Sequence, residues 1–166
     1  AEAMLQRGNV GAKYVSAWAL GTLAGYAFSA TPWQPRVGLQ VDAASGDRRR
    51  GDGRIQTFNP LFPNGYYFTL AGYTGYANLI HVKPSVTVKP LPDLKVLAAL
   101  GFQWRETTAD AVYGQPFAVV PGTAGRGGSR TGTYAQLRAD WTISRNVAAA
   151  IEGVHFQVAD SIRQLG

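Results

Sequence analysis

Apolar and polar side chains alternate with a period of two residues along much of this chain, and this pattern limits the possible folds more than any other feature. Val37 and Leu39, for example, alternate with Arg36 and Gln40. Successive side chains of a β-strand point to opposite faces, whereas a helix repeats its apolar positions every three to four residues. Four segments therefore predict strands with one apolar and one polar face: residues 35–47, 78–90, 93–106 and 132–143.

Two further segments alternate less regularly. In residues 13–28 large side chains alternate with small ones, and in residues 147–158 the polarity is mixed. The register that keeps Glu152 off the apolar face of the second segment leaves Val154 and Phe156 on its polar face. This predicts a β-bulge or a position at a membrane rim for that strand.

The connections between these six strands alternate in length. Short turns occupy residues 29–34, 91–93 and 144–146, whereas residues 45–77 and 107–131 form long loops. Tight turns on one side and long loops on the other are typical of an up-and-down β-barrel of the outer membrane. We therefore expect an all-β, antiparallel up-and-down transmembrane β-barrel in the bacterial outer membrane, with both long loops outside the cell.

The number of strands indicates that the barrel is larger than residues 1–166. Bacterial barrels have at least about eight strands, and an open sheet edge inside lipid leaves backbone groups without partners. The tail 160–166 does not read as a closing amphipathic strand. We expect a single barrel segment, with the missing strands supplied by the rest of the chain or by another copy.

The aromatic residues form two groups along the predicted strands, as they do at the two interfaces of a membrane with outer-membrane lipid. One group lies near the short turns and the other near the long loops: Tyr26, Phe28, Trp33 and Trp141, then Tyr14, Trp18, Tyr76, Phe102 and Trp104. A soluble, lipocalin-like ligand-binding barrel, with its apolar faces inside, is the alternative. It would crowd these rings toward both ends of its interior.

The composition argues against an enzyme. The chain has no cysteine, which excludes disulfides, thiol nucleophiles and cysteine-based zinc sites. Its two histidines, His81 and His155, lie on different predicted strands without ligand-like spacing. Residues 122–128 are rich in glycine but lack the Lys-Ser/Thr ending of a phosphate-binding loop. We expect no metal, no cofactor and no enzymatic activity.

The charges favour an anionic partner. The 16 Lys and Arg residues outnumber the 10 Asp and Glu residues, which gives a formal net charge of +6. A cationic pore wall concentrates anions, although pairing of these charges with one another is the alternative. The polar strand faces contribute these candidates for the lumen: Arg36, Lys83, Lys89, Lys95, Arg105 and Arg138, opposed by Asp42, Asp140 and Glu152.

The first long loop contains a basic cluster followed by an aromatic block. The basic residues Arg48, Arg49, Arg50 and Arg54 could gather anions at the mouth, contact lipopolysaccharide phosphates or remain solvated. Nucleic acid is not expected, because no recognition helix or basic-aromatic face accompanies them. The aromatic block either covers the opening or packs on the rim, and its candidate residues are Phe58, Phe62, Tyr66 and Tyr67.

Residues 57–68, with the sequence TFNPLFPNGYYF, resemble the alginate-export family of outer-membrane barrels. The likeness continues through residues 78–88 and 112–114, and residues 44–47 match a strand-to-loop transition of the family. The resemblance implies a multi-stranded barrel, longer than this chain, that passes an anionic polysaccharide or a related solute through a lumen lined by Arg and Lys. A general porin-like channel and a channel for hydrophobic solutes are the alternatives within membranes.

Overall fold

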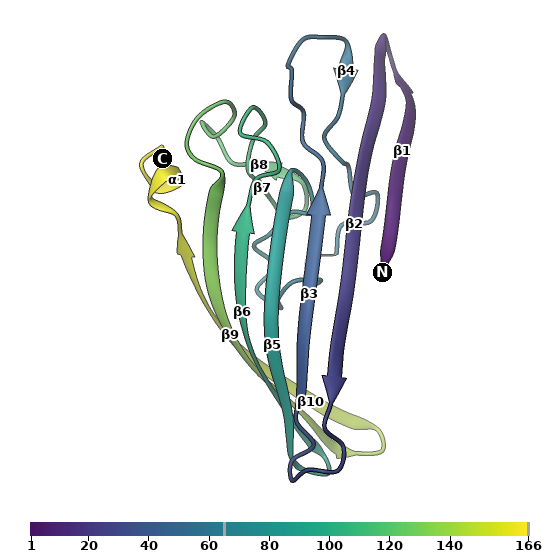
Figure 1. Cartoon of the computed structure of the whole chain (residues 1–166), viewed down its shortest axis with the longest axis vertical. Helices are drawn as coiled ribbons and strands as arrows, with labels where there is room; N and C mark the ends of the chain where they lie inside the picture. Colours follow the sequence, from purple (N-terminus) through teal and green to yellow (C-terminus); the bar gives the residue numbers. More distant parts are fainter. Residues whose placement is uncertain (65, 166) are drawn as a thin grey trace.

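The computed structural model describes residues 1–64 and 66–165, and its main element is one antiparallel sheet (Figure 1). Neighbouring strands follow the order β1-β2-β3-β5-β6-β9-β10, and each pair along this path is antiparallel. The strands have these bounds: β1 Glu2–Val10, β2 Lys13–Ala27, β3 Arg36–Ala44, β5 Leu79–Leu91, β6 Leu94–Trp104, β9 Arg130–Ser144 and β10 Val147–Val158. The predicted all-β meander is confirmed.

All six predicted strands are present, and β1 is an additional strand that the sequence did not reveal. Its pattern is interrupted by Gly8 and Asn9, so it lacks the regular alternation of the others. The strand is nevertheless defined in the structure, because it pairs with β2 along its whole length. A two-residue turn joins the two strands, and Gly11 in this turn has a φ of 60°, which glycine adopts without steric cost.

The remaining elements are short and lie in or beside the long loops. Strand β4 (Arg54–Ile55) pairs in parallel with β2, and β7 (Tyr113–Gly114) pairs with β8 (Ala118–Val119). Helix α1 (Asp160–Arg163) follows β10. Among the described residues, no helix is long and apolar enough to cross a membrane.

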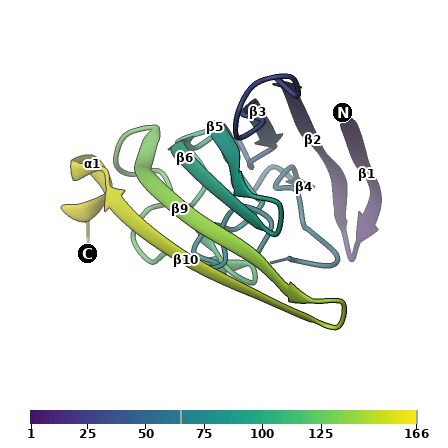
Figure 2. The same cartoon turned by 90° about the horizontal axis from the view of Figure 1, so that it is seen from below.

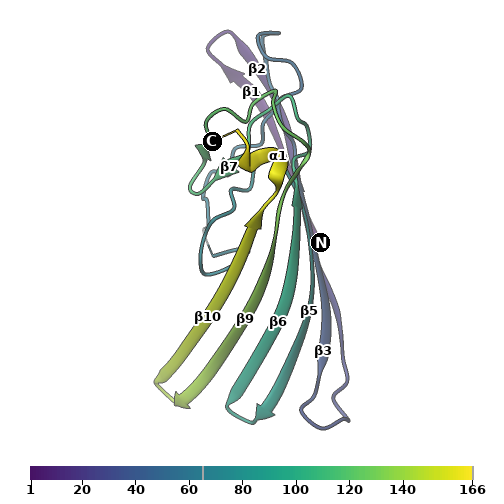
Figure 3. The ribbon, with the colours of Figure 1, turned by 90° about the vertical axis from the view of Figure 1, so that its left-hand side faces the viewer.

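The sheet is curved, and the two long loops fold against its hollow side, which we call the inner face (Figure 2). Seen along its edge, the loops cover the half of the inner face near the long-loop end, while the half near the short turns stays uncovered (Figure 3). Strands β1 and β10 form opposite edges of the sheet and do not pair with each other within the described residues. The described part of the chain is therefore an open sheet and not a closed barrel.

Most large apolar residues of the strands lie on the opposite side, the outer face, as the alternation predicted. Val37, Val86, Leu100 and Leu137 are large apolar residues that remain exposed there. The soluble-barrel alternative requires these side chains inside, so the structure disagrees with it. A small apolar core lies on the inner face instead, where Phe58 packs against the alanines of β2 and β3.

No β-bulge interrupts the middle of β10, so that part of the expectation was wrong, and the alternative of a position at the membrane rim stays a prediction. The register between β9 and β10 is continuous from Ala148 to Val158, and its one shift lies at the short-turn end. Ile151 is 75% exposed on the outer face, whereas Val154 and Phe156 share the inner face with Glu152. The apolar pair can lie there because Tyr73 and Tyr134 lie against Phe156.

Candidate functional site

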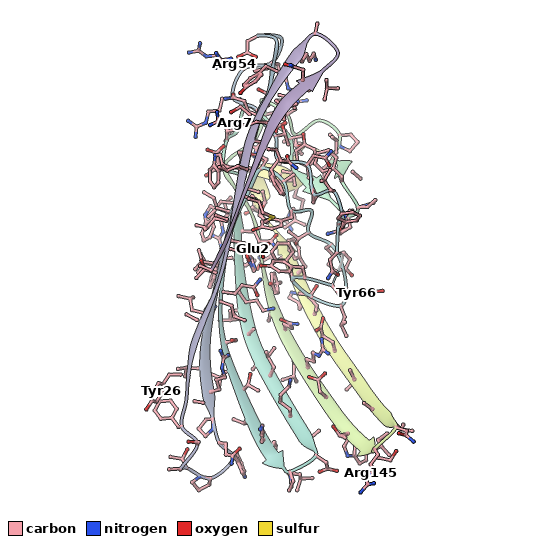
Figure 4. All side chains as sticks on the ribbon, turned by 90° about the vertical axis from the view of Figure 1, so that its right-hand side faces the viewer. Glu2, Arg7, Tyr26, Arg54, Tyr66 and Arg145 are labelled. Atoms are coloured by element: carbon pink, nitrogen blue, oxygen red, sulfur yellow. The ribbon has the colours of Figure 1, made fainter. Side chains whose placement is uncertain are left out.

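Residues 57–64 and 66–77, which we call the covering segment, lie along the inner face of the sheet. Phe58 and Phe68 are buried against the sheet. Phe62 is 93% exposed, and Tyr66 extends away from the sheet on the same side (Figure 4). The aromatic block thus lies over the inner face, and its two predicted roles, covering the opening or packing on the rim, stay predictions.

A hydrogen-bonded chain of side chains connects the covering segment to three strands. Asp42 and His81 are both 0% exposed, and their Oδ2 and Nδ1 atoms lie 2.9 Å apart. His81 Nε2 lies 2.9 Å from the hydroxyl of Tyr134 on β9. The Tyr67 hydroxyl donates to Asp42 Oδ1 over 2.8 Å, and Gln40 Nε2 donates to Oδ2 over 2.9 Å. Asp42 thus binds the covering segment and is not exposed to a lumen.

Aromatic rings form a second connection over the same residues. Edge-to-face and stacked pairs of this kind contribute about 0.5–1.5 kcal/mol each beyond the burial of their surface. The rings follow one another from the covering segment across the sheet, with these centroid separations: Phe58–Tyr76 5.9 Å, Tyr76–Phe68 5.8 Å, Phe68–His81 4.8 Å, His81–Tyr134 5.9 Å and Tyr134–Phe156 6.1 Å. The covering segment is therefore packed against the inner face of the sheet through its aromatic side chains.

Two of the expected lumen charges also hold the covering segment. Lys83 Nζ, which is buried, donates to the carbonyl oxygen of Phe68 over 2.7 Å. Glu152 Oε1 accepts from the backbone N–H of Leu70 over 2.7 Å, and its Oε2 accepts from Gln136 Nε2 over 2.6 Å. Both charged groups are satisfied by this segment and by the wall, which favours the structural role that the sequence left open for them.

Arg105 organises the second long loop. The residue is 2% exposed, and its terminal nitrogens donate to five backbone carbonyl oxygens, those of residues 108, 110, 123, 126 and 128. Burial lowers the pKa of its guanidinium, and the charge of Asp110 partly opposes this change. Arg105 thus lies inside the loop and not on a wetted wall.

Asp110 joins the two long loops. Its carboxylate accepts from the Thr57 hydroxyl over 2.5 Å, from the Asp47 N–H over 2.9 Å and from the Tyr113 hydroxyl over 3.0 Å. Burial and this carboxylate raise the pKa of the Tyr113 phenol to about 12. Asp110 could not be selected from the sequence, because the donors from the first long loop, the Thr57 hydroxyl and the Asp47 N–H, are 53 and 63 residues away along the chain.

The uncovered half of the inner face carries the other expected lumen charges. Reading across the sheet, Arg36 lies opposite Thr87, Thr87 opposite Leu97, Leu97 opposite Arg138, and Arg138 opposite Glu152. Residues directly opposite each other on antiparallel strands share a face. The five residues therefore form one row across the wall, about level with the lower limit of the covering segment.

One step closer to the short turns, the inner face is again more basic than acidic. Lys95 lies opposite Asp140, with 3.8 Å between Nζ and Oδ2. Arg138 donates to Oδ1 of the same Asp140 over 2.6 and 2.9 Å. Lys89, near the turn, is exposed. One carboxylate thus serves two cations here, and Arg36 and Lys89 add further positive charge.

The basic residues of the first long loop do not act as one cluster. Arg48 forms an ion pair with Glu106, and this interaction raises the pKa of its guanidinium. Arg49, Arg50 and Arg54 are exposed. The mouth-facing role of these three stays a prediction.

Several neutral residues also shape the inner face, and they were not among the predicted site residues because only charged and aromatic residues were considered. Gly101 provides space for the ring of Tyr134, since a Cβ atom at this position would overlap it. Gly25 and Gly38 likewise lie beneath the guanidinium of Arg36. A glycine placed opposite a large side chain could have indicated such contacts. This arrangement is recognisable only when the pairing of the strands is known.

The described residues also line a partly open cavity between the covering segment, the second long loop and β10. Its volume is about 460 Å³, and its wall is mostly apolar, with Phe156 among the lining residues. Gln103 Nε2, on the same wall, donates to Thr74 Oγ1 over 2.7 Å. Within residues 1–64 and 66–165, no group of His, Asp and Glu has a geometry suited to a metal ion.

Alkaline pH is expected to loosen the covering segment. Burial and the hydrogen bond to Asp42 raise the pKa of the Tyr67 phenol above its ordinary value, which is about 10. A raised pKa means that this contribution to stability is complete below about pH 10 and is lost as the pH rises further. Since the chain has no cysteine, a dye on Phe62→Cys reports the segment selectively, and its anisotropy should fall above about pH 10.

The matched control for this titration is Tyr67→Phe in the same labelled protein. It should be looser at neutral pH and change less on alkalinisation, with a remaining change from Tyr76 and Tyr113, whose pKa values are also raised by burial. An unaltered titration curve in Tyr67→Phe would contradict the role of this phenol.

Of the comparisons with known proteins, the scan against family models gives a match. The family model described as Alginate export matches residues 1–166. The curated proteins and the solved structures give no match to this chain. Members of the matched family are transport proteins of the outer membrane and not enzymes. With a match over its whole length, this chain belongs to the alginate export family.

Proposed function

We propose that this chain forms part of the wall of an outer-membrane conduit that exports an anionic polysaccharide, with alginate as the substrate that the family indicates. The observation that carries the proposal is the uncovered inner face near the short turns. There, Arg36, Lys89, Lys95 and Arg138 outnumber the neighbouring carboxylates. A polyanion that passes this face meets an excess of positive charge.

In this proposal the outer face contacts the hydrocarbon of the membrane. Its exposed apolar side chains, such as Val86 and Leu100, would be costly in water as a continuous surface and are suited to lipid. The free edges of β1 and β10 then require partners, because unpaired backbone groups are unfavourable in a bilayer. Further strands outside the described residues, from the same protein or another copy, would close the barrel.

The two halves of the inner face would have different tasks. The half near the long-loop end holds the covering segment, which narrows the conduit from the outside. The half near the short turns leaves its cations accessible for carboxylates of the substrate, and guanidinium groups bind carboxylates in two-point geometry. Since Asp140 already shares these cations, each contact with the substrate is weak, and weak repeated contacts let a polymer slide.

Reversal potentials in a salt gradient test the proposal on the complete protein in planar bilayers. The unaltered protein should be selective for anions. Arg36→Ser combined with Arg138→Ser should shift the reversal potential toward the value for a cation-selective pore, because Lys89 and Lys95 then no longer outnumber Asp140 and Glu152. Arg105 is unsuited to the test, since its guanidinium is occupied by the loop.

Lys13→Ser is the matched control, because Lys13 is exposed beside the β1–β2 turn, at the opposite end of the sheet. It should leave the reversal potential unchanged. Current carried by cations in the unaltered protein would contradict the proposed anionic conduit. Equal reversal potentials in the double variant would assign Arg36 and Arg138 to a purely structural role, and the general porin-like alternative would then be favoured.

A further inference from the structure

Three arginines point outward from the sheet at its long-loop end. Arg7 lies on β1 two residues beyond Leu5, and both side chains are exposed. Arg54 pairs with Tyr14 of β2. Figure 4 shows Arg7 and Arg54 on the same side of the sheet as Tyr26, while Tyr66 extends from the other side.

The third member, Arg130, is placed on the same face by a β-bulge. The register between β6 and β9 shifts so that Arg130 lies opposite Trp104. Trp104 belongs to the outer-face series of β6 that includes Leu100, and directly opposed residues share a face. Without this shift the alternation would turn Arg130 toward the inner face.

We call these three arginines the outer rim. Each of them lies where the apolar surface of the outer face ends, on the side of the long loops. Tyr14 is opposite Arg54, and Trp104 is opposite Arg130. For Arg7 the ring is Trp18, which is opposite Leu5 one step closer to the short turns. Aromatic side chains mark the level at which hydrocarbon gives way to headgroups, so the outer rim lies at headgroup height.

The cations of the outer rim have no acidic partner among the described residues. No ion pair involves their guanidinium groups. Asp52, two residues before Arg54, accepts a hydrogen bond from the backbone N–H of Arg54 and not from its guanidinium. The opposite end of the outer face differs, because there the indole of Trp141 donates to a carboxylate, that of Asp93, over 2.9 Å.

We propose that the outer rim binds the phosphate groups of the phosphorylated glycolipid in the outer leaflet, an inference that rests on the proposed function for its membrane orientation. Arginine matches phosphate oxygens with two parallel N–H donors and is favoured where phosphates are recognised. The polysaccharide is not the ligand of this surface, because the outer rim faces away from the conduit. Bound glycolipid would fix the height of the long-loop end in the membrane.

The test measures lipid retained by the purified complete protein, using lipid A with two phosphates and the same glycolipid without phosphate as probes. The unaltered protein should retain the phosphorylated form preferentially in native mass spectrometry. The triple variant Arg7→Ser, Arg54→Ser and Arg130→Ser should lower its retention at least about tenfold, since each arginine near an anionic lipid surface strengthens binding about fivefold.

Arg145→Ser is the matched control, because Arg145 lies at the short-turn end (Figure 4) and should leave retention unchanged. Equal retention of both glycolipids, or full retention by the triple variant, would overturn the proposal that the outer rim binds phosphate. Selectivity separates this outcome from failure of the proposed function: an anion-selective channel without glycolipid binding refutes the outer rim alone, whereas a protein that forms no anion-selective channel refutes the conduit.

Discussion

Replacing Gly101 by alanine is expected to lower the free energy of unfolding by about 1–3 kcal/mol, the usual cost of forcing extra volume into a packed site. A Cβ atom at this position of β6 would overlap the ring of Tyr134. That ring cannot move away freely, because it is buried, contacts His81 Nε2 through its hydroxyl and stacks on Phe156. Urea titration of the refolded protein, followed by tryptophan fluorescence, measures the difference.

Gly153→Ala provides the matched control within the same sheet. Gly153 lies on the outer face of β10, and a Cβ atom there would meet nothing within 4 Å. This variant should be neutral or more stable by up to about 1 kcal/mol, because alanine restricts the unfolded chain. Similar losses in both variants would refute the role of Gly101. So would a loss in Gly101→Ala that persists when Tyr134 is also replaced by alanine.

Replacing Arg105 by methionine should have the largest effect on the second long loop, with a loss of about 1–3 kcal/mol, the usual cost of leaving buried polar groups without a hydrogen-bond partner. Five backbone carbonyl oxygens lose the guanidinium as a donor, and only those of Thr108 and Thr123 keep a backbone N–H, while the length of the side chain is nearly kept. Hydrogen exchange of residues 106–129 should become much faster. Arg105→Lys should not restore it, because one ammonium group cannot reach the same set of acceptors.

Arg126→Met is the control for this experiment, since Arg126 lies in the same loop but is exposed. Its effect should remain within about 0.5 kcal/mol, as is usual for surface positions. Unchanged hydrogen exchange in Arg105→Met would show that the loop keeps its shape without the guanidinium.

The sequence alone determined six of the seven long strands and, for most of their residues, which face each side chain occupies. The two faces of β3, with Val37 outside and Asp42 inside, follow from alternation within one segment, because side-chain direction in a strand depends only on position. The lengths of the turns and loops are likewise local properties. The residues of 57–68 were sufficient to indicate the family, which the match over the whole chain then established.

Only the tertiary structure decided what the charged and aromatic residues do. Glu152 meets Leu70 across 82 positions of the chain, and His81 meets Tyr134 across 53. Arg105 has the same residue type and strand parity as a pore-lining cation, yet the second long loop folds around it. Which loop bends inward, and which charge it uses, depends on contacts between segments far apart in sequence, and a period-two pattern carries no information about those.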